Sequence, residues 1–565
     1  MIERSSVVHM SSYHFAYPID ENTLAVRLIA RCGDLNKVEV LYKNLYDHQS
    51  PMNRKEMGFK LCDGLHDVFE IEISVVQKRF KYYFCLYGEE ETIYFTSDGF
   101  LDNPTEKNSF FVPYINPDEI VRMPQWAHGE IIYQVLVDRF YDGDKSNNPA
   151  GVKPWDTIPD RSTYYGGDFK GLTEKLDYIA SLGAKMIYLS PVFSSPTYHK
   201  YDIDDYYNIE SIYGGEKDLI TLVENAHKKG IKIILDGVFN HCSIDNPLFK
   251  DVIEKGEKSQ YADWFCVLEY PVDINKCNYE SFADLVSTMP RFNTSNPKVI
   301  EYLTDSAVYW TKKLNIDGWR LDVADEISHD FLMVFRKRIK EANPQAIIIG
   351  EIWNNAQQWL LGKEMDTCTN YKFRNALLSL AKGTEEAKSF WHRIAQYLTL
   401  YKTPYYGYLI NLIGSHDTER ICSVMQGEEN AFPVIVAMLA FEGIPLIYYG
   451  DECGIMGGED PDNRRAMPWE KINEDFAIRV REMANFRSKN TVLKLGTTQP
   501  VELNEPKVLA FLRIYGDEKL FIAINFAQED AVVEYEVTKR LIGNGEIDGR
   551  EIIIPPKGYI IAQAQ

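Results

Sequence analysis

Four carboxylates stand at the ends of apolar segments in the middle of the chain. If these segments are strands, their ends would bring the carboxylates together. Asp236 follows Ile231–Leu235, Glu351 follows three consecutive isoleucines, and Asp322 and Asp417 close two further segments. Two opposed carboxyl groups can cleave a glycosidic bond, one as nucleophile or base and the other as acid. The types and spacing of these residues therefore favour glycoside cleavage.

Arg320 and Asp322 are separated by one residue, so in a strand both side chains point to the same face. A guanidinium next to a carboxylate keeps that carboxylate ionised, which a nucleophile requires. Glu351 stands in an apolar setting, which raises the pKa of a carboxyl group and suits a general acid. We therefore expect Asp322 and Glu351 to have different roles.

Each of these residues also has a structural explanation. An aspartate at a strand end is often only the N-cap of the next helix, and a histidine such as His241 or His416 is more often structural than catalytic. That explanation accounts for the strand ends singly but not jointly. The sequence has no P-loop, no GxGxxG after a strand, no H-E-x-x-H and no serine nucleophile elbow, so no other common chemistry competes.

The elements that must position these carboxylates alternate between β-rich and helical segments from Gly129 onward. This alternation is typical of βα units and a parallel sheet. Eight strands are the number that a (β/α)8 TIM barrel needs, and its chemistry sits at the carboxyl ends of the strands. The predicted strands are 131–140, 185–192, 231–239, 317–323, 346–353, 365–371, 408–413 and 444–449.

The predicted α/β fold has three further parts. Residues 1–120 are expected to form an N-terminal β-sandwich, because four of their segments alternate apolar and polar residues. The interval 241–293 is too long for a βα loop, so we expect an inserted domain at about 242–295 within a barrel over 121–490. Residues 491–565 are expected to form a C-terminal β-sandwich. The predicted strands of the two sandwiches are 23–30, 37–42, 68–76, 79–87, 508–514, 520–525, 531–537 and 551–554.

The composition excludes several classes of partner. With 61 basic and 83 acidic side chains among 565 residues, the net charge of −22 disfavours nucleic acid and anionic lipid. The longest uncharged apolar run, Ala431–Phe441, falls far short of the roughly 20 residues of a membrane span. The nine cysteines include no C-x-x-C pair, so neither a disulfide framework nor a zinc site is predicted. We expect a soluble cytoplasmic protein.

The strand ends and three flanking blocks resemble the α-amylase family, glycoside hydrolase family 13. The blocks are Tyr165–Leu172, His199–Asp202 and Gly443–Glu452, and all of the family's signature blocks occur in order over nearly the whole chain. The resemblance implies a retaining mechanism with Asp322 as nucleophile, Glu351 as acid/base and Asp417 as the transition-state stabiliser. It also implies substrate-binding roles for His199, Tyr201, Asp236, His241, Arg320, Glu326, Trp353, His416, Asp460 and Arg464.

The segment Met289–Asn293 resembles the MPKLN block of cyclomaltodextrinases, neopullulanases and maltogenic amylases. In that group the leading β-domain swaps across a homodimer and narrows the partner's active site. The resemblance thus implies a domain-swapped homodimer acting on α-1,4 bonds of cyclodextrins and maltooligosaccharides, with pullulan and starch as further α-glucan substrates. A plain starch-binding module is the alternative for the N-terminal domain.

Several positions depart from the family pattern, among them Arg291, Phe292, Asp325 and Asn354. They border the acceptor subsites, so the preferred substrate and the balance of hydrolysis against transglycosylation stay open. A 4-α-glucanotransferase or an α-1,6-active glucosidase is the alternative on the same fold. A non-catalytic barrel, as in amino-acid transporter subunits, is the alternative of another class, but those proteins lack the full carboxylate set.

The segment Asp142–Asn148 contains the hard oxygen ligands and the glycine that Ca²⁺ prefers. Alone, such a segment is more often a solvated polar turn. The resemblance implies a structural Ca²⁺ here, although many relatives begin this loop with Asn where Asp142 stands. The implied ligands are Asp142, Asp144, Asn147, Asn148, the Gly166 carbonyl and Asp168.

Overall fold

The computed structural model describes residues 1–284 and 286–565. These residues form two compact units. The first comprises residues 1–122, 357–363 and 388–406, and the second comprises 123–356, 364–387 and 407–565.

The first unit is built on two antiparallel sheets. One has the order β1-β2-β6-β5, and the other has the order β4-β3-β7-β8-β9 with β10 paired to β7. Leu24, Val26, Val38, Val40 and Phe84 belong to the buried core of the sandwich. The predicted N-terminal β-sandwich is confirmed. The strands are β1 (Ala16–Pro18), β2 (Thr23–Arg31), β3 (Lys37–Asn44), β4 (Asn53–Glu56), β5 (Gly58–Cys62), β6 (His66–Ser74), β7 (Phe80–Tyr87), β8 (Thr92–Thr96), β9 (Gly99–Leu101) and β10 (Phe110–Val112).

Buried Arg27 joins the first unit's sandwich to residues that lie far along the chain. Its guanidinium forms an ion pair of 2.6 Å with Glu70 and donates to the carbonyl oxygens of Thr399 and Tyr401 at 2.7 and 3.1 Å. A buried guanidinium must have its donors satisfied, and these acceptors satisfy it. Residues 388–406 thus belong to this unit, although they lie within the range 121–490 that was predicted for the barrel.

The second unit contains the predicted barrel. Its eight parallel strands follow the order β20-β19-β18-β15-β12-β11-β22-β21, and a parallel bridge between Thr369 and Ile410 closes the circle. Each strand is shorter than predicted, because residues at one or both ends of each predicted segment lie outside the ladder. The strands are β11 (Ile131–Val135), β12 (Ala184–Leu189), β15 (Lys232–Gly237), β18 (Gly318–Leu321), β19 (Ile347–Gly350), β20 (Thr367–Cys368), β21 (Ile410–Leu412) and β22 (Ile444–Tyr448).

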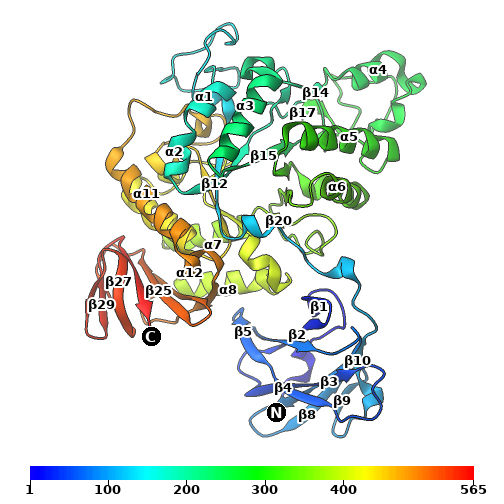
Figure 1. The fold of residues 1–565 in the computed structure, drawn as a ribbon, viewed down its shortest axis with the longest axis vertical. Helices are drawn as coiled ribbons and strands as arrows, with labels where there is room; N and C mark the ends of the chain where they lie inside the picture. Colours follow the sequence, from blue (N-terminus) through cyan, green and yellow to red (C-terminus); the bar gives the residue numbers. More distant parts are fainter. Residues whose placement is uncertain (285) are drawn as a thin grey trace. The chain divides into compact units, whose positions relative to one another are not determined.

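Helices surround these strands (Figure 1). Most are amphipathic, and α5 shows the pattern, because Val299, Leu303, Ala307 and Trp310 recur at helical spacing and are buried. The excursion between β15 and α5 contains α4 (Pro247–Lys255) and a short hairpin of β16 (Ser281–Phe282) and β17 (Val286–Pro290). The larger helices of the barrel are α3 (Gly215–Lys228), α5 (Pro297–Leu314), α6 (His329–Ala342), α7 (Tyr371–Ala381), α10 (Glu428–Ala440) and α11 (Glu474–Lys489).

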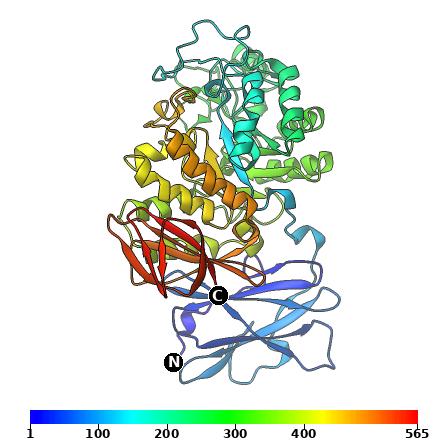
Figure 2. The same ribbon diagram turned by 60° about the vertical axis from the view of Figure 1, so that its left-hand side comes forward.

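The C-terminal strands, red in Figure 2, form two antiparallel sheets. The prediction of one strand over 531–537 is wrong, because the chain leaves β26 after Glu534 and begins β27 in the other sheet at Val537. The strands are β23 (Thr497–Pro500), β24 (Val508–Tyr515), β25 (Glu518–Asn525), β26 (Ala531–Glu534), β27 (Val537–Gly543), β28 (Glu546–Asp548), β29 (Glu551–Ile554) and β30 (Tyr559–Ala564).

Among the described residues, the structure contains no helix with both the length and the apolar character that a membrane span requires.

Candidate active site

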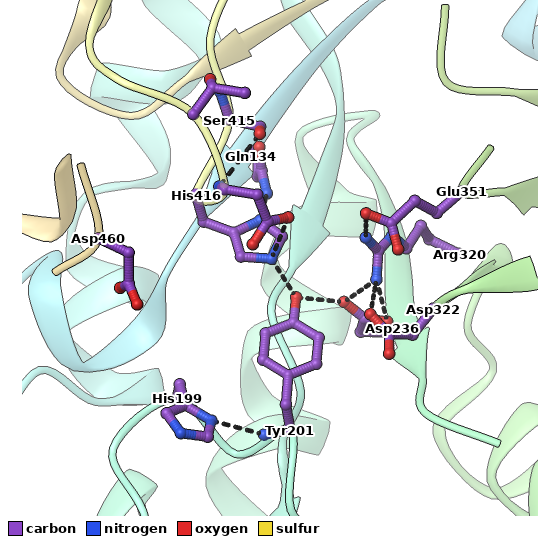
Figure 3. A network of polar contacts seen from close by, with 12 residues as sticks. Gln134, His199, Tyr201, Asp236, Arg320, Asp322, Glu351, Ser415, His416 and Asp460 are labelled. Atoms are coloured by element: carbon purple, nitrogen blue, oxygen red, sulfur yellow. Dashed lines mark hydrogen bonds and ion pairs between the residues drawn. The ribbon is translucent and has the colours of Figure 1, made fainter. Parts of the chain in front are cut away.

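The guanidinium of Arg320 is the centre of a polar network at the carboxyl ends of the barrel strands (Figure 3). Its Nη1 atom lies 2.7 Å from Asp322 Oδ1 and 3.0 Å from Asp236 Oδ1. Its Nη2 atom lies 2.8 Å from Glu351 Oε1. One buried cation therefore contacts three carboxylates that come from three neighbouring strands.

The register of the parallel strands produces this arrangement. Asp236 on β15 pairs directly with Arg320 on β18, so both side chains lie on the same face. Asp322 follows two residues after Arg320 and shares that face. Glu351 comes directly after Gly350, which pairs with Leu321 at the end of β18. The sequence pattern correctly predicted that these strand ends converge.

Val323, next to Asp322, has φ +46° and ψ +47°, which is the left-handed region. For a β-branched residue this conformation is strained, and such strain concentrates at functional sites. The conformation directs the Val323 N–H to Glu351 Oε2, which accepts it at 2.9 Å. The strained turn therefore fixes the carboxylate of Glu351 relative to Asp322.

The ionisation of Asp322 differs from the prediction. Arg320 lies beside it as expected, but burial raises the pKa of Asp322 well above its ordinary value, and the nearby Glu351 and Asp236 carboxylates add to the rise. Burial also raises the pKa of Asp236, although the Arg320 guanidinium opposes this. Three carboxyl groups share one guanidinium, so its charge does not offset theirs, and the cluster retains a proton to higher pH than an isolated aspartate would.

A second arm of the network runs from Asp236 to His416. The Tyr201 hydroxyl donates to Asp236 Oδ2 at 2.9 Å and lies 2.6 Å from His416 Nε2. On its other side, His416 Nδ1 lies 2.7 Å from the Gln134 amide. Burial lowers the pKa of His416 well below its ordinary value, so the ring is neutral. The Tyr201 and His416 rings stack with an interplanar angle of 4°.

Asp417 is exposed beside this arm. Its Oδ2 atom lies 3.0 Å from His416 Nε2 and its Oδ1 atom lies 3.4 Å from Arg464 Nη2. Arg464 also contacts Asp460 at 3.0 Å and donates from Nε to the His416 carbonyl at 2.9 Å. Arg464 thus aligns Asp417 and Asp460 on the same rim.

Two predicted histidines flank Tyr201. His199 Nδ1 accepts the Tyr201 N–H at 3.1 Å, and His241 Nε2 lies 3.1 Å from the Tyr201 carbonyl oxygen. Burial lowers the pKa of His199 to about 3 and that of His241 to about 4. His241 Nδ1 is buried and has no hydrogen-bond partner among the described residues. A substrate hydroxyl is one group that would satisfy it.

Glu326 and Trp353 lie outside this hydrogen-bonded network. The Glu326 carboxylate is exposed and accepts from Asn240 at 3.4 Å. Trp353 is 41% exposed and stacks on Tyr371 with ring centroids 3.8 Å apart and an interplanar angle of 7°. An exposed indole held flat by a second ring is suited to contact a sugar face.

Sequence reasoning missed three residues that complete the network. Tyr188 donates its hydroxyl to Asp236 Oδ2 at 2.5 Å, Gln134 contacts His416, and the Val323 N–H binds Glu351. Gln134 carried a signal, since it is the single polar side chain in the apolar segment Ile131–Val135. No such signal marked Tyr188 or Val323, because a tyrosine or a valine in a barrel strand is usually a core residue.

The predicted calcium ligands form a separate group. Asp142 Oδ1, Asn147 Oδ1 and Asn148 Oδ1 are buried and have no hydrogen-bond partner among the described residues. Asp168 is the N-cap of α1 (Phe169–Glu174) and accepts the Gly171 N–H at 2.6 Å. Asp144 accepts from Ser146 at 2.6 Å. The first three residues therefore offer free oxygens, whereas the carboxylates of Asp144 and Asp168 already accept hydrogen bonds.

The comparison with known proteins agrees with this geometry. Residues 134–491 match the family described as "Alpha amylase, catalytic domain", and residues 1–116 match "Alpha amylase, N-terminal ig-like domain". A cyclomaltodextrinase of Thermoanaerobacter pseudethanolicus is 38% identical over 98% of this chain and 96% of its own. Neopullulanase 2 of Thermoactinomyces vulgaris is 38% identical over 94% of this chain and 92% of its own.

A solved cyclomaltodextrinase structure superposes with a TM-score of 0.94 at 31% identity and covers 100% of both chains. The likeness extends over the β-domain, the barrel and the C-terminal sheets together. The chain therefore belongs to the α-amylase family of glycoside hydrolases, in the group of cyclomaltodextrinases, neopullulanases and maltogenic amylases.

Proposed function

We propose that this protein is a retaining hydrolase that cleaves α-1,4-glucosidic bonds in cyclodextrins and maltooligosaccharides, with pullulan and starch as further substrates. The observation that carries the proposal is the contact of one buried guanidinium, that of Arg320, with both Asp322 and Glu351. Two carboxylates on one guanidinium lie close together, which favours a covalent, retaining route over a route that needs room for water between them.

In the first step, an Asp322 oxygen attacks the anomeric carbon while Glu351 protonates the departing glycosidic oxygen. The carbon–oxygen bond to the leaving sugar breaks, and a glycosyl ester on Asp322 forms. In the second step, Glu351 takes a proton from water, the water oxygen attacks the anomeric carbon, and Asp322 is released. Each step inverts the anomeric carbon, so the product retains the configuration of the substrate.

The proton that the carboxyl cluster retains has a use in this scheme. A productive complex needs Glu351 protonated and Asp322 ionised. The Arg320 Nη1 donor favours the ionised form of Asp322, whereas burial and the neighbouring carboxylates raise the pKa of Asp322. Glu351 is held by donors on both oxygens, because Oε1 lies 2.8 Å from Arg320 Nη2 and Oε2 accepts the Val323 N–H, and these contacts fix its orientation toward the leaving group.

Sugar binding involves residues of the second arm and residues that lie outside it. The free Nδ1 atom of His241 and the exposed carboxylate of Asp417 would bind sugar hydroxyls. Tyr201 and Trp353 present ring faces, and His199, His416, Asp460 and Arg464 hold these groups in place. Neutral histidines can both donate and accept, which matches the hydroxyl groups of a neutral glucan.

A structural Ca²⁺ fits part of the predicted site. Asp142, Asn147 and Asn148 offer buried oxygens without partners, and a Cβ atom at Gly166 would lie 2.3 Å from Asn148 Oδ1, so only glycine leaves this cradle open. These residues and the Gly166 carbonyl would hold the ion, which when bound would tie the loop after β11 to the segment before α1. Asp144 could join through Oδ2, because its hydrogen bonds with Ser146 use Oδ1 alone, whereas both oxygens of Asp168 accept hydrogen bonds and would have to give some up.

We further propose that the protein is a homodimer whose exchanged N-terminal sandwich limits access to starch, and that it works in the cytoplasm. The likeness to relatives over the whole chain supports the first point. All nine cysteines are free thiols, which suits a reducing compartment.

The test is product analysis on β-cyclodextrin, pullulan and soluble starch beside a light-scattering mass. Glu351→Gln serves as the inactive control, because the amide keeps the shape but cannot donate an acidic proton. Faster cleavage of β-cyclodextrin than of starch by a dimer supports the proposal. A monomer that prefers starch contradicts the limited access, and activity that survives Glu351→Gln contradicts the catalytic assignment.

A further inference from the structure

Cys32, Cys62 and Asp67 form a cluster in the N-terminal sandwich that the proposed hydrolase activity does not use. One ligand atom from each residue lies within 4.8 Å of the other two, and the two Sγ atoms are 3.2 Å apart. The sequence spacing predicted no such site, because Cys32 and Cys62 are 30 residues apart. The sheet brings them together.

The sheet order explains the cluster. β6 lies between β2 and β5, and its residue Asp67 pairs with Ala30 on β2 and with Cys62 on β5. Cys32 lies in the turn directly after β2, two residues beyond Ala30, and its Sγ atom lies 3.2 Å from Cys62 Sγ. The turn after β2 then continues through Gly33, whose φ of +72° lies in the left-handed region that glycine adopts without strain.

Backbone groups already orient the potential ligands. The Gly64 N–H donates to Cys62 Sγ at 3.3 Å, and the Gly33 N–H donates to Asp67 Oδ2 at 2.7 Å. Donation from a backbone N–H favours the thiolate, which is the form that binds metals. Both glycines follow their cysteine closely and adopt positive φ.

The Asp67 carboxylate lacks a cationic partner. Asp67 is only 8% exposed, and none of the ion pairs among the described residues includes it. A divalent cation would pair with the Asp67 carboxylate, and a buried unpaired carboxylate is otherwise unfavourable.

We propose that Cys32, Cys62 and Asp67 bind a thiophilic divalent cation of the Zn²⁺ class. Two thiols release two protons to solvent as two metal–sulfur bonds and one metal–carboxylate bond form, and nothing is oxidised or reduced. A tetrahedral site with Zn–S bonds of about 2.3 Å needs sulfurs about 3.8 Å apart. The observed 3.2 Å is nearer to that separation than to the 2.05 Å of a disulfide. Because Cys32 is exposed, water completes the coordination.

The test is a Co²⁺ titration of the reduced, metal-free full-length protein, followed by competition with Zn²⁺. We expect a thiolate-to-cobalt charge-transfer band at one equivalent, which Zn²⁺ abolishes and which strengthens with rising pH. Cys32→Ser, Cys62→Ser and Asp67→Asn should each weaken Co²⁺ binding by at least tenfold. Cys266→Ser and Cys277→Ser, at half-buried cysteines outside the cluster, should leave binding unchanged.

Three results would overturn the proposal. The first is a wild-type protein without the charge-transfer band. The second is a band that persists in Cys32→Ser and Cys62→Ser. The third is a reduced protein that binds no cation but gives, after treatment with a small disulfide, a peptide joined at Cys32 and Cys62. Because the readout is spectroscopic, it is independent of the hydrolase activity.

Discussion

The backbone N–H of Val323, held in the left-handed region, donates to Glu351 Oε2 across 2.9 Å. The residue that follows the proposed nucleophile therefore positions the proposed acid. This contact links the ends of β18 and β19 directly, independently of Arg320. The strain of a β-branched residue in this conformation is the cost of the contact.

Val323→Asn should relieve that strain, because asparagine adopts the left-handed region more readily than valine. We expect the free energy of unfolding to rise by about 1 kcal/mol, with kcat changed by less than about threefold, since the N–H is kept. Urea denaturation and initial rates measure both quantities. A clear loss of stability would show that the valine side chain, not the backbone conformation, matters at this position.

Tyr188→Phe removes a buried hydroxyl that donates to Asp236 at 2.5 Å. We expect the free energy of unfolding to fall by about 1–3 kcal/mol and kcat to fall as well, because Asp236 loses a donor beside Arg320. The matched control is Tyr408→Phe, whose buried hydroxyl has no hydrogen-bond partner among the described residues. Equal effects of the two substitutions on urea midpoints would contradict the role given to Tyr188.

The buried histidines predict a loss of stability in acid. Burial lowers the pKa of His241 to about 4, whereas the unfolded chain has a histidine pKa near 6.5. Between these values the unfolded state binds more protons, so stability falls as pH falls from about 6.5 to 4. The contribution of His241 is at most about 3 kcal/mol. His241→Asn should flatten this part of the urea-midpoint profile, and an unchanged slope would refute the assignment.

Calcium removal should lower the melting temperature. Asp142 and Asn148 offer buried oxygens without partners, so an ion that satisfies them stabilises the folded state alone. We expect a chelator to lower the melting temperature of the wild type by several degrees. Asn148→Ala should lower it without chelator and remove most of the chelator effect. A melting temperature that the chelator does not move would show that Ca²⁺ is not bound there.

The sequence predicted the barrel because its strand segments are apolar and end in chemically distinctive residues. Asp236, Arg320, Asp322 and Glu351 could be placed together because the carboxyl ends of parallel strands share one rim. The raised pKa of Asp322 could not be predicted, because it depends on how closely residues from neighbouring strands approach.

Contacts between remote segments were equally beyond the sequence pattern. Residues 388–406 contact the N-terminal sandwich through Arg27, Tyr17 and Glu70, which in the sequence are ordinary strand residues. Cys32 and Cys62 meet only because β6 separates β2 from β5 by a single strand. Such pairings follow from the sheet order, which local periodicity does not encode.

The anomeric configuration of the first product tests the central claim, the pairing of Asp322 with Glu351, most directly. Proton NMR during the first minutes of maltooligosaccharide hydrolysis, before mutarotation, separates the two anomers. The two-step mechanism predicts that the new reducing end appears first as the α-anomer and later equilibrates. Initial release of the β-anomer would contradict the covalent intermediate on Asp322.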